Sequence, residues 1–288
     1  MTLSRRAILL LLAPALLVVA VGLALPIGWL IRFSLLQSET GMPVSDALTT
    51  ANYERLLGDA FHMRVFLRTL GMSAAITICA LVLGYPLAHA LWRAPPRWRG
   101  ALTIAVLSPL LVSIVVSSYG WLVILGTNGL ANRALLALGL ISSPVKLIYT
   151  EFAILLGLVH IVLPFVVLSV LAALERIDPR YAEAASVLGA GRFAVLRHVT
   201  LPLALPGLIA GTTLAFSIAM SAYVTPAVLG PSGPNFIATS IYNEFVTLFD
   251  WGMGAAMATL LLVLGLGLVF AFLRLAYRFG GVAAAGRA

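Results

Sequence analysis

The side chains in this 288-residue sequence that could do chemistry are hydroxyl groups set within two apolar segments. In the later segment Ser217 and Ser221 are four residues apart, so they share a helix face, and Tyr223 follows them. The earlier segment contains Ser118 and Tyr119. Uncharged hydroxyls can line a path for a polar solute that must also be released, or they can hydrogen-bond one membrane helix to another. Both interpretations are open, and neither involves catalysis.

The sequence lacks the sets of residues that catalysis, metal binding or nucleotide binding would require. Its four histidines are far apart without a metal-ligand neighbour at helical spacing, and Cys79 is the only cysteine. A P-loop needs a lysine directly after a glycine, whereas the only lysine, Lys146, lies between Val145 and Leu147. We therefore predict a chain that is not an enzyme, holds no metal and binds no cofactor itself.

The composition, 61% hydrophobic and 10% charged, predicts an all-α membrane protein. Six apolar segments are long enough to cross a bilayer, and they must be helices because a backbone in lipid has to satisfy its own hydrogen bonds. The expected spans are Ile8–Leu36, Phe66–Leu91, Ala101–Gly126, Tyr149–Leu174, Leu203–Leu229 and Trp251–Leu275. We expect residues 1–288 to form a single transmembrane domain with a disordered Ala/Gly-rich tail at 280–288.

The N-terminal apolar run extends from Ala7 to Ile31. The apolar core of a cleaved signal peptide has only about 7–15 residues. This length predicts a retained first span.

The distribution of charge predicts that both termini face the cytoplasm. With the N-terminus inside, 12 of the 18 basic residues and three of the 10 acids fall on the inner side, so the inner net charge is +9 and the outer net charge is −1. Basic residues favour cytoplasmic loops, which explains the overall charge of +8. The arginines are scattered between apolar spans, so we predict no binding of nucleic acid. The same count places the loop of residues 175–202 in the cytoplasm.

That cytoplasmic loop contains the longest polar passage of the chain, Asp178–Pro202. It begins with an aspartate and a proline, which are typical of a helix start, and Gly189 favours the left-handed conformation that ends a helix. A second short helix is expected over Arg192–His198, ended by Leu201 and Pro202. The passage could be a docking surface for another protein or an amphipathic helix that rests on lipid headgroups.

Within this loop, Glu183, Ala184 and Ala185, then Gly189 after three residues and the segment 199–202 after nine more, resemble the EAA loop of ABC-importer permeases. That pattern reads E-A-A-x3-G-x9-I-x-L-P, and the only departure is Val199 in place of isoleucine. The resemblance implies a coupling helix that docks on a cytoplasmic ATPase subunit. The docking residues implied are Arg180, Glu183, Ala184, Ala185, Gly189, Leu201 and Pro202.

Further passages, at residues 52–56, 66–70, 83–88 and 222–230, resemble the spermidine/putrescine branch of these permeases. The resemblance implies a type I importer fold in the bacterial inner membrane. It also implies four kinds of partner: an ABC ATPase dimer that holds ATP and magnesium, a second and often different permease subunit, a solute-binding protein and the lipid bilayer.

The expected cargo is a small polar solute, most of all a polyamine such as spermidine or putrescine. Three alternatives stay open within the same branch, namely amino acids, opines and phosphonates. A stand-alone channel or secondary carrier is the alternative of another class. The acids lie in loops and at span ends, which disfavours coupling to protons or sodium ions.

Two further hypotheses concern single side chains. Glu244 and Asp250 lie on the expected outer side and could receive a cationic cargo or a basic surface of the binding protein. His160 lies near the middle of the fourth span, four residues before Pro164. It is either a functional group or a neutral histidine bonded to a carbonyl that Pro164 leaves free.

Overall fold

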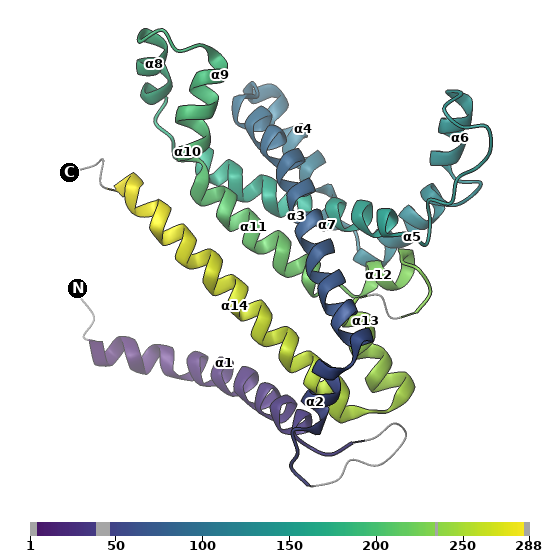
Figure 1. The fold of residues 1–288 in the computed structure, drawn as a ribbon. Helices are drawn as coiled ribbons and strands as arrows, with labels where there is room; N and C mark the ends of the chain where they lie inside the picture. Colours follow the sequence, from purple (N-terminus) through teal and green to yellow (C-terminus); the bar gives the residue numbers. More distant parts are fainter. Residues whose placement is uncertain (1–4, 39–46, 234–235, 285–288) are drawn as a thin grey trace. The chain divides into compact units, whose positions relative to one another are not determined.

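A computed structural model of the chain describes residues 5–38, 47–233 and 236–284. Over these residues the chain is helical, without a strand and with a single isolated antiparallel bridge between Leu36 and Leu48 (Figure 1). This confirms the predicted all-α class. The long α-helices are α1 (Arg5–Ser34), α3 (Ala60–Arg93), α7 (Glu151–Leu174), α11 (Leu205–Met220) and α14 (Trp251–Ala284).

The remaining elements are short. The α-helices among them are α2 (Ala51–Gly58), α4 (Pro96–Leu107), α5 (Ile114–Leu125), α6 (Leu130–Ala137), α8 (Arg180–Val187), α9 (Arg192–Val195), α10 (Leu201–Leu203), α12 (Val224–Leu229) and α13 (Ile237–Tyr242). A 3-10 turn, η1 (Ser108–Leu111), and two π-helical segments, η2 (Leu196–Thr200) and η3 (Asn243–Leu248), complete the set.

The chain divides into two compact units, residues 1–63 with 240–263, and residues 64–239 with 264–288. The first unit holds α1, α2 and the start of α14, and the second holds α4 to α12. The α14 helix ends at Ala284, so it extends into the segment 280–288 for which the sequence predicts disorder. Residues 285–288 lie outside the described part of the chain.

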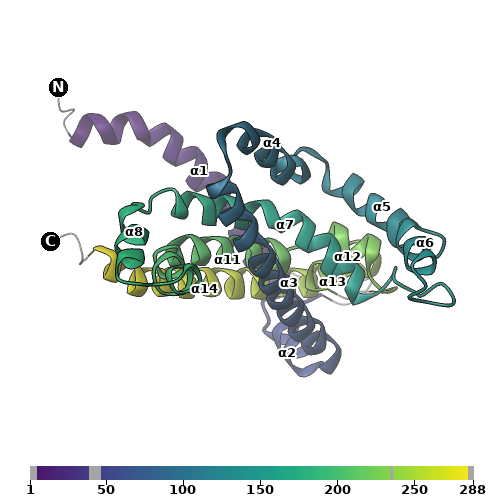
Figure 2. The same cartoon turned by 90° about the horizontal axis from the view of Figure 1, so that it is seen from above.

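The second unit is organised around α7. This 24-residue helix begins at an N-cap, where the Thr150 hydroxyl accepts a hydrogen bond from the Ala153 N–H at 3.3 Å. It is apolar all round, and half of its residues are buried. A helix of that kind must be covered on several sides. Figure 2 shows α11 running alongside it, and α3 and α12 also pack against it.

Glycine residues let the neighbouring helices approach α7 closely. A Cβ atom built at Gly207 of α11 would lie 2.5 Å from the Ala173 Cβ atom, and one at Gly84 of α3 would lie 2.8 Å from the Val166 Cγ1 atom. Gly211 faces the same Val166, whose Cα atom would be 3.3 Å from an added Cβ atom. Small residues at such positions are what membrane helices use to pack, since lipid supplies no hydrophobic drive between them.

Two of the predicted spans are broken rather than continuous, which corrects the sequence-based bounds. The span expected at Ala101–Gly126 consists of α4, η1 and α5, because Pro109 lies in η1 and the backbone is extended at Val112 and Ser113. The span expected at Leu203–Leu229 consists of α11 and α12, which are separated at residues 221–223.

Over the described residues, five helical stretches are long and apolar enough to cross a membrane, and there are six if one bent pair counts as a single span. The stretch that replaces the third predicted span runs over Ile114–Ala137. The bent pair is Arg192–Leu203 with Leu205–Met220, at an angle of 64°. The chain is therefore a multi-pass helical membrane protein, as predicted, with different bounds for its third and fifth spans.

The close packing of helices at glycine predicts that replacing glycine by alanine changes stability in opposite directions at two positions, one inside a helix contact and one outside it. Gly207→Ala should destabilise the chain by about 1–3 kcal/mol, because the added methyl group overlaps Ala173 and the Ser169 carbonyl oxygen. Gly71→Ala on α3 should be neutral or stabilise by up to about 1 kcal/mol, since nothing lies within 4 Å of the added atom and alanine favours a helix. Thermal unfolding of both variants in one detergent measures the difference. Equal midpoints for the two variants would contradict the glycine contact.

Candidate functional site

The loop of residues 175–202 that the sequence singles out folds as two helices joined by a tight turn, and α8 forms the first of them (Figure 1). The Asp178 Oδ1 atom accepts a hydrogen bond from the Arg180 N–H at 2.9 Å, and Pro179 already has helical angles of φ −54° and ψ −27°. Aspartate followed by proline therefore starts α8, as predicted.

The α8 helix ends in a Schellman motif centred on Gly189. This glycine has φ +86°, and its N–H donates to the Ser186 carbonyl oxygen at 3.0 Å. The following residue, Ala190, donates its N–H to the Ala185 carbonyl oxygen, also at 3.0 Å. These two bonds define the motif and need a left-handed residue at the turn. The predicted role of Gly189 in ending the helix is confirmed.

The docking residues implied by the resemblance differ in exposure. Arg180, Glu183 and Ala184 are exposed on α8, and Ala185 is half-buried. Leu201 and Pro202 are also exposed, but they lie in α10, at the end of the second helix nearer α11 (Figure 1). The structure thus places four of these residues along α8, with Gly189 at its end, and leaves Leu201 and Pro202 at the base of the loop.

Large apolar side chains surround the Gly189 turn, and we call these the apolar tip: Val187, Leu188 and Phe193. They are 87%, 88% and 72% exposed. Exposed apolar residues grouped in this way mark a surface that contacts another protein or a membrane. Sequence reasoning missed the apolar tip, although its signal was present as large apolar residues on both sides of the glycine turn.

The second helix of the loop is longer than predicted. It continues through α9, η2 and α10 to Leu203, so Leu201 and Pro202 do not end it. Proline has no N–H to donate to a carbonyl one turn earlier. The η2 segment widens the helix just before Pro202, and the Leu201 N–H bonds to the Leu196 carbonyl oxygen in the π-helical pattern. The chain bends instead at Ala204, two residues before Pro206.

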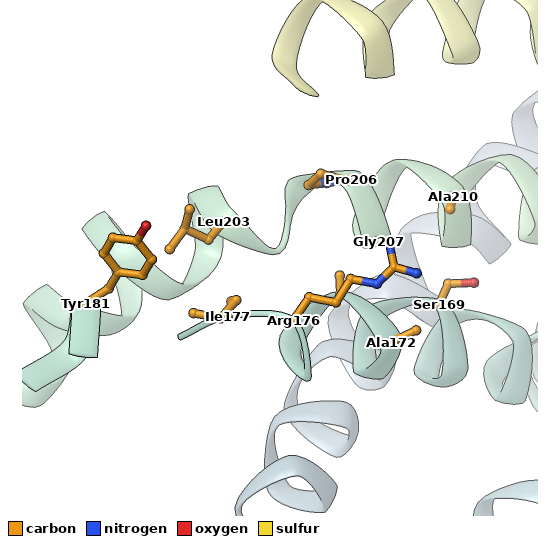
Figure 3. A pocket seen from close by; sticks show the side chains of 10 residues that line it. Ser169, Ala172, Arg176, Ile177, Tyr181, Leu203, Pro206, Gly207 and Ala210 are labelled. Carbon is orange, nitrogen blue, oxygen red and sulfur yellow. The ribbon is translucent and has the colours of Figure 1, made fainter. Parts of the chain in front are cut away.

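A cavity of about 430 Å³ lies behind the loop, between the end of α7, the start of α8 and the junction of α10 with α11 (Figure 3). Its lining is mostly small or apolar. The polar side chains that line it are Ser169, Arg176 and Tyr181. Because Tyr181 belongs to α8, the cavity connects the loop to the packed helices of the second unit.

The hydroxyl residues predicted to line a path fall into two groups. Ser118 is buried, and its Oγ atom lies 3.1 Å from the Thr225 Oγ1 atom, so it joins α5 to α12 as a helix–helix contact. The other four, Tyr119, Ser217, Ser221 and Tyr223, are exposed or half-buried. The structure supports the packing interpretation for Ser118, and the path interpretation stays a prediction for the other four.

Ser221 and Tyr223 lie at the break between α11 and α12, where they line a cavity of about 190 Å³. The Ser221 Oγ atom donates a hydrogen bond to the Ser217 carbonyl oxygen at 3.0 Å, so Ser217 and Ser221 remain neighbours although the helix ends at Met220. The rest of the cavity wall is largely apolar. Broken helices that expose a few hydroxyls are typical of solute sites in transporters.

His160 contacts an indole rather than a free carbonyl group. Its Nδ1 atom accepts a hydrogen bond from the Trp121 Nε1–H at 3.4 Å, and the two rings meet edge to face at 5.8 Å. The expected bond to a carbonyl near Pro164 is therefore not the contact that the structure shows. This pairing fixes α7 to α5.

The proposed cargo-receiving role of Asp250 is wrong, because this side chain is 0% exposed in the first unit. Its Oδ2 atom lies 3.1 Å from the Arg55 guanidinium, and its Oδ1 atom accepts hydrogen bonds from the Ser38 hydroxyl and, at 3.0 Å, from the Met253 N–H. Both oxygens are thus satisfied within the chain. Asp250 joins three segments of the first unit and is not available to a solute.

Glu244 lies beside this network and is also buried. The His62 Nε2 atom is 3.6 Å from the Glu244 Oε1 atom, and the His62 Nδ1 atom is 2.8 Å from the Asp59 Oδ2 atom. Burial and the negative charge of Asp250 raise the pKa of Glu244, and the opposing effects of His62 and Arg55 are smaller. A buried carboxyl held towards its protonated form is a poor receptor for a cation.

Comparison with known families accounts for most of the chain. Residues 80–278 match the family model described as "Binding-protein-dependent transport system inner membrane component". The spermidine/putrescine transport system permease protein PotB of Escherichia coli (strain K12) is 34% identical over 255 residues, which cover 84% of this chain and 92% of PotB.

Solved structures show the same fold at lower identity. A bacterial alginate ABC transporter, in complex with an alginate pentasaccharide-bound periplasmic protein, contains a chain with a TM-score of 0.78 at 19% identity, covering 93% of each chain. The MetNI methionine ABC transporter contains one with a TM-score of 0.60 at 20% identity, covering 75% of this chain and 95% of the other. These similarities show that this chain has the same fold as those two chains.

The buried position of Glu244 predicts a stability that falls as pH rises. Its pKa is raised above the usual 4.5 in the folded chain, so the folded state binds the proton more tightly than the unfolded state. Stability is fully present below the unfolded pKa and is lost as pH rises through the folded pKa. In Glu244→Gln this loss should disappear, while Glu54→Gln, at an exposed carboxylate of α2, should keep the wild-type profile.

Thermal midpoints between about pH 4 and pH 8 would show the effect, since about 1 kcal/mol moves the midpoint of a chain of this size by about 2–4 °C. An unchanged pH profile in Glu244→Gln would contradict it.

Proposed function

The chain belongs to the family of binding-protein-dependent transport system inner membrane components and is a permease subunit of an ABC importer, and we propose that its cargo is a polyamine such as spermidine or putrescine. It is a transport subunit and not an enzyme. The cargo rests on the relatives that carry this name and on their coverage of most of both chains. We place the chain in a bacterial inner membrane with both termini in the cytoplasm.

The exposed loop at α8 supports the mechanical part of this proposal. The α8 helix ends in a Schellman turn, and the exposed side chains of Leu188 and Phe193 project beside that turn. Apolar side chains that project in this way can fill a cleft on a partner protein. The proposed partner is an ATPase dimer that holds ATP and magnesium, as the resemblance of this loop to the EAA loop implies; this sequence has no P-loop of its own. Movement of the loop passes along α9 to α10 into α11, since these segments are consecutive in the chain.

The exposed hydroxyls support a path that a second subunit completes. Tyr119, Ser221 and Tyr223 are exposed on the surface of this chain, so a second permease, homologous but encoded separately, would cover them and form the other half of the path. A solute-binding protein delivers the cargo on the outer side. The cavity at Ser221 and Tyr223 has no carboxylate in its lining, which suits release of a cation more than tight binding.

Docking can be tested with two neighbouring glycines that differ in conformation. Gly189→Val should weaken co-purification with the ATPase strongly, because a β-branched residue at φ +86° costs about 1–2 kcal/mol and distorts the turn. Gly191→Val should co-purify normally, since Gly191 has φ −67° and ψ 162° and nothing lies within 4 Å of the added atom. Both variants should insert into the membrane like the wild type. Wild-type recovery of the ATPase with Gly189→Val would contradict a docking role for the turn.

Cargo and energy source can be tested in proteoliposomes. Spermidine uptake should require the ATPase, the binding protein and ATP, and Ser221→Leu should lower uptake at least severalfold without loss of ATPase binding. Ser118→Ala should instead lower thermal stability by about 1 kcal/mol and leave uptake near the wild-type rate, because Ser118 bonds Thr225.

Two outcomes would exclude parts of the proposal. Uptake by the purified chain alone would favour a stand-alone channel or carrier. ATP-dependent uptake of an amino acid, opine or phosphonate but not of a polyamine would keep the importer and replace the cargo.

A further inference from the structure

The cavity of about 430 Å³ behind the loop contains a cationic group among apolar walls. Figure 3 shows the Arg176 side chain extending along the cavity towards Gly207 and Ser169, with Tyr181 at the other end and Ile177 between them. The Ser169 hydroxyl donates its hydrogen bond to the Phe165 carbonyl oxygen at 2.7 Å, so it is not a free donor. Arg176 and the Tyr181 hydroxyl are therefore the groups that could hold an anion.

The acids nearest to Arg176 in the sequence are engaged elsewhere. Glu175 forms an ion pair with Arg99, and the Asp178 Oδ1 atom accepts the Arg180 N–H at 2.9 Å. No carboxylate lines the cavity, and no ion pair of Arg176 occurs within the described ranges. The positive charge of Arg176 is thus available to a ligand.

The rest of the lining favours an amphiphile over a small hydrated anion. The apolar or small members are Ala172, Ala173, Ile177, Leu203, Pro206, Gly207 and Ala210. A free phosphate ion would need several donors to replace its water, and this wall supplies few. A lipid would place its phosphate at Arg176 and its glycerol and acyl carbons against the apolar wall.

We propose that this cavity binds the phosphate group of an anionic phospholipid from the inner leaflet. Arg176 lies directly after the last turns of α7, at a membrane boundary that the charge distribution places on the cytoplasmic side. Basic pockets between helices on that side bind anionic headgroups. The proposal depends on this orientation and not on the cargo.

A bound lipid would also hold α8. Tyr181 is the residue of α8 that lines the cavity, and it lies two positions before Glu183 of the docking surface. Occupancy would therefore fix the position from which the apolar tip meets its partner. The lipid would act as part of the loop's support.

The test uses native mass spectrometry of the full chain released from nanodiscs that contain equal amounts of phosphatidylglycerol and phosphatidylcholine. The wild type should retain phosphatidylglycerol preferentially. Arg176→Gln should lower the retained phosphatidylglycerol about fivefold, the effect of one basic residue at a membrane surface. Ala210→Phe fills the cavity and leaves the charge, and it should lower retention as well.

Arg192→Gln is the matched control, because it removes a positive charge from the same loop outside the cavity lining and outside the docking residues. It should retain lipid like the wild type, and added inorganic phosphate should not displace the lipid. Thermal unfolding checks that each variant is folded. If a folded Arg176→Gln retains the wild-type amount, or if Arg192→Gln loses as much, the proposal is overturned.

Displacement by inorganic phosphate would assign the site to the free ion instead. Equal retention of phosphatidylcholine would show that the cavity is an apolar groove without preference for an anionic headgroup. Either outcome also overturns the lipid assignment, and neither bears on the proposed cargo.

Discussion

Close contact between helices at glycine is the constraint on which the second unit depends. Membrane helices gain no hydrophobic free energy by leaving lipid for one another, so their packing relies on many short van der Waals contacts. Val166 of α7 meets Gly84 on one side and Gly211 on the other, and Gly207 lies against Ala173. A side chain at any of these glycines would separate the helices that carry the loop from the helix that supports them.

The same arrangement anchors the loop of residues 175–202. The loop leaves the C-terminal end of α7, turns through the Schellman motif at Gly189 and returns by a second helix into α11, which packs back on α7. The loop is thus anchored at both ends on one tightly packed pair. The chain bends by 64° between the second helix of the loop and α11, just before Leu205.

The ends of helices can be predicted from the sequence where a few adjacent residues determine them by their own backbone preferences. Asp178, Pro179 and Gly189 set the start and end of α8 by their own backbone preferences, and the EAA pattern identified the loop. Hydropathy identified the spans but averaged over their interruptions, so the breaks at Ser113 and Ser221 were missed. Pro109 and Pro226 were visible in the sequence, yet proline also occurs inside continuous helices such as α7.

Polar contacts between residues far apart in the sequence could not be predicted from local sequence patterns. Asp250 resembles an ordinary loop acid in the sequence, and only tertiary structure brings Ser38 and Arg55 to it. The apolar tip had a signal in the sequence, since large apolar residues flank the glycine turn, but the exposure of Leu188 depends on the turn that follows it. Site residues that act through exposure or distant partners need the fold before they can be assigned.

The Asp250 network has a consequence for biosynthesis. Ser38 and Asp250 are 212 positions apart, so at a synthesis rate of about 5–20 residues per second the ribosome needs roughly 10–40 s between them. During that interval Arg55 and Ser38 have left the ribosome without their shared carboxylate. The N-terminal segment of the nascent protein, which holds α1 and α2, therefore lacks these bonds until Asp250 and the start of α14 are synthesised. Chaperones and membrane proteases can act on the segment during this period.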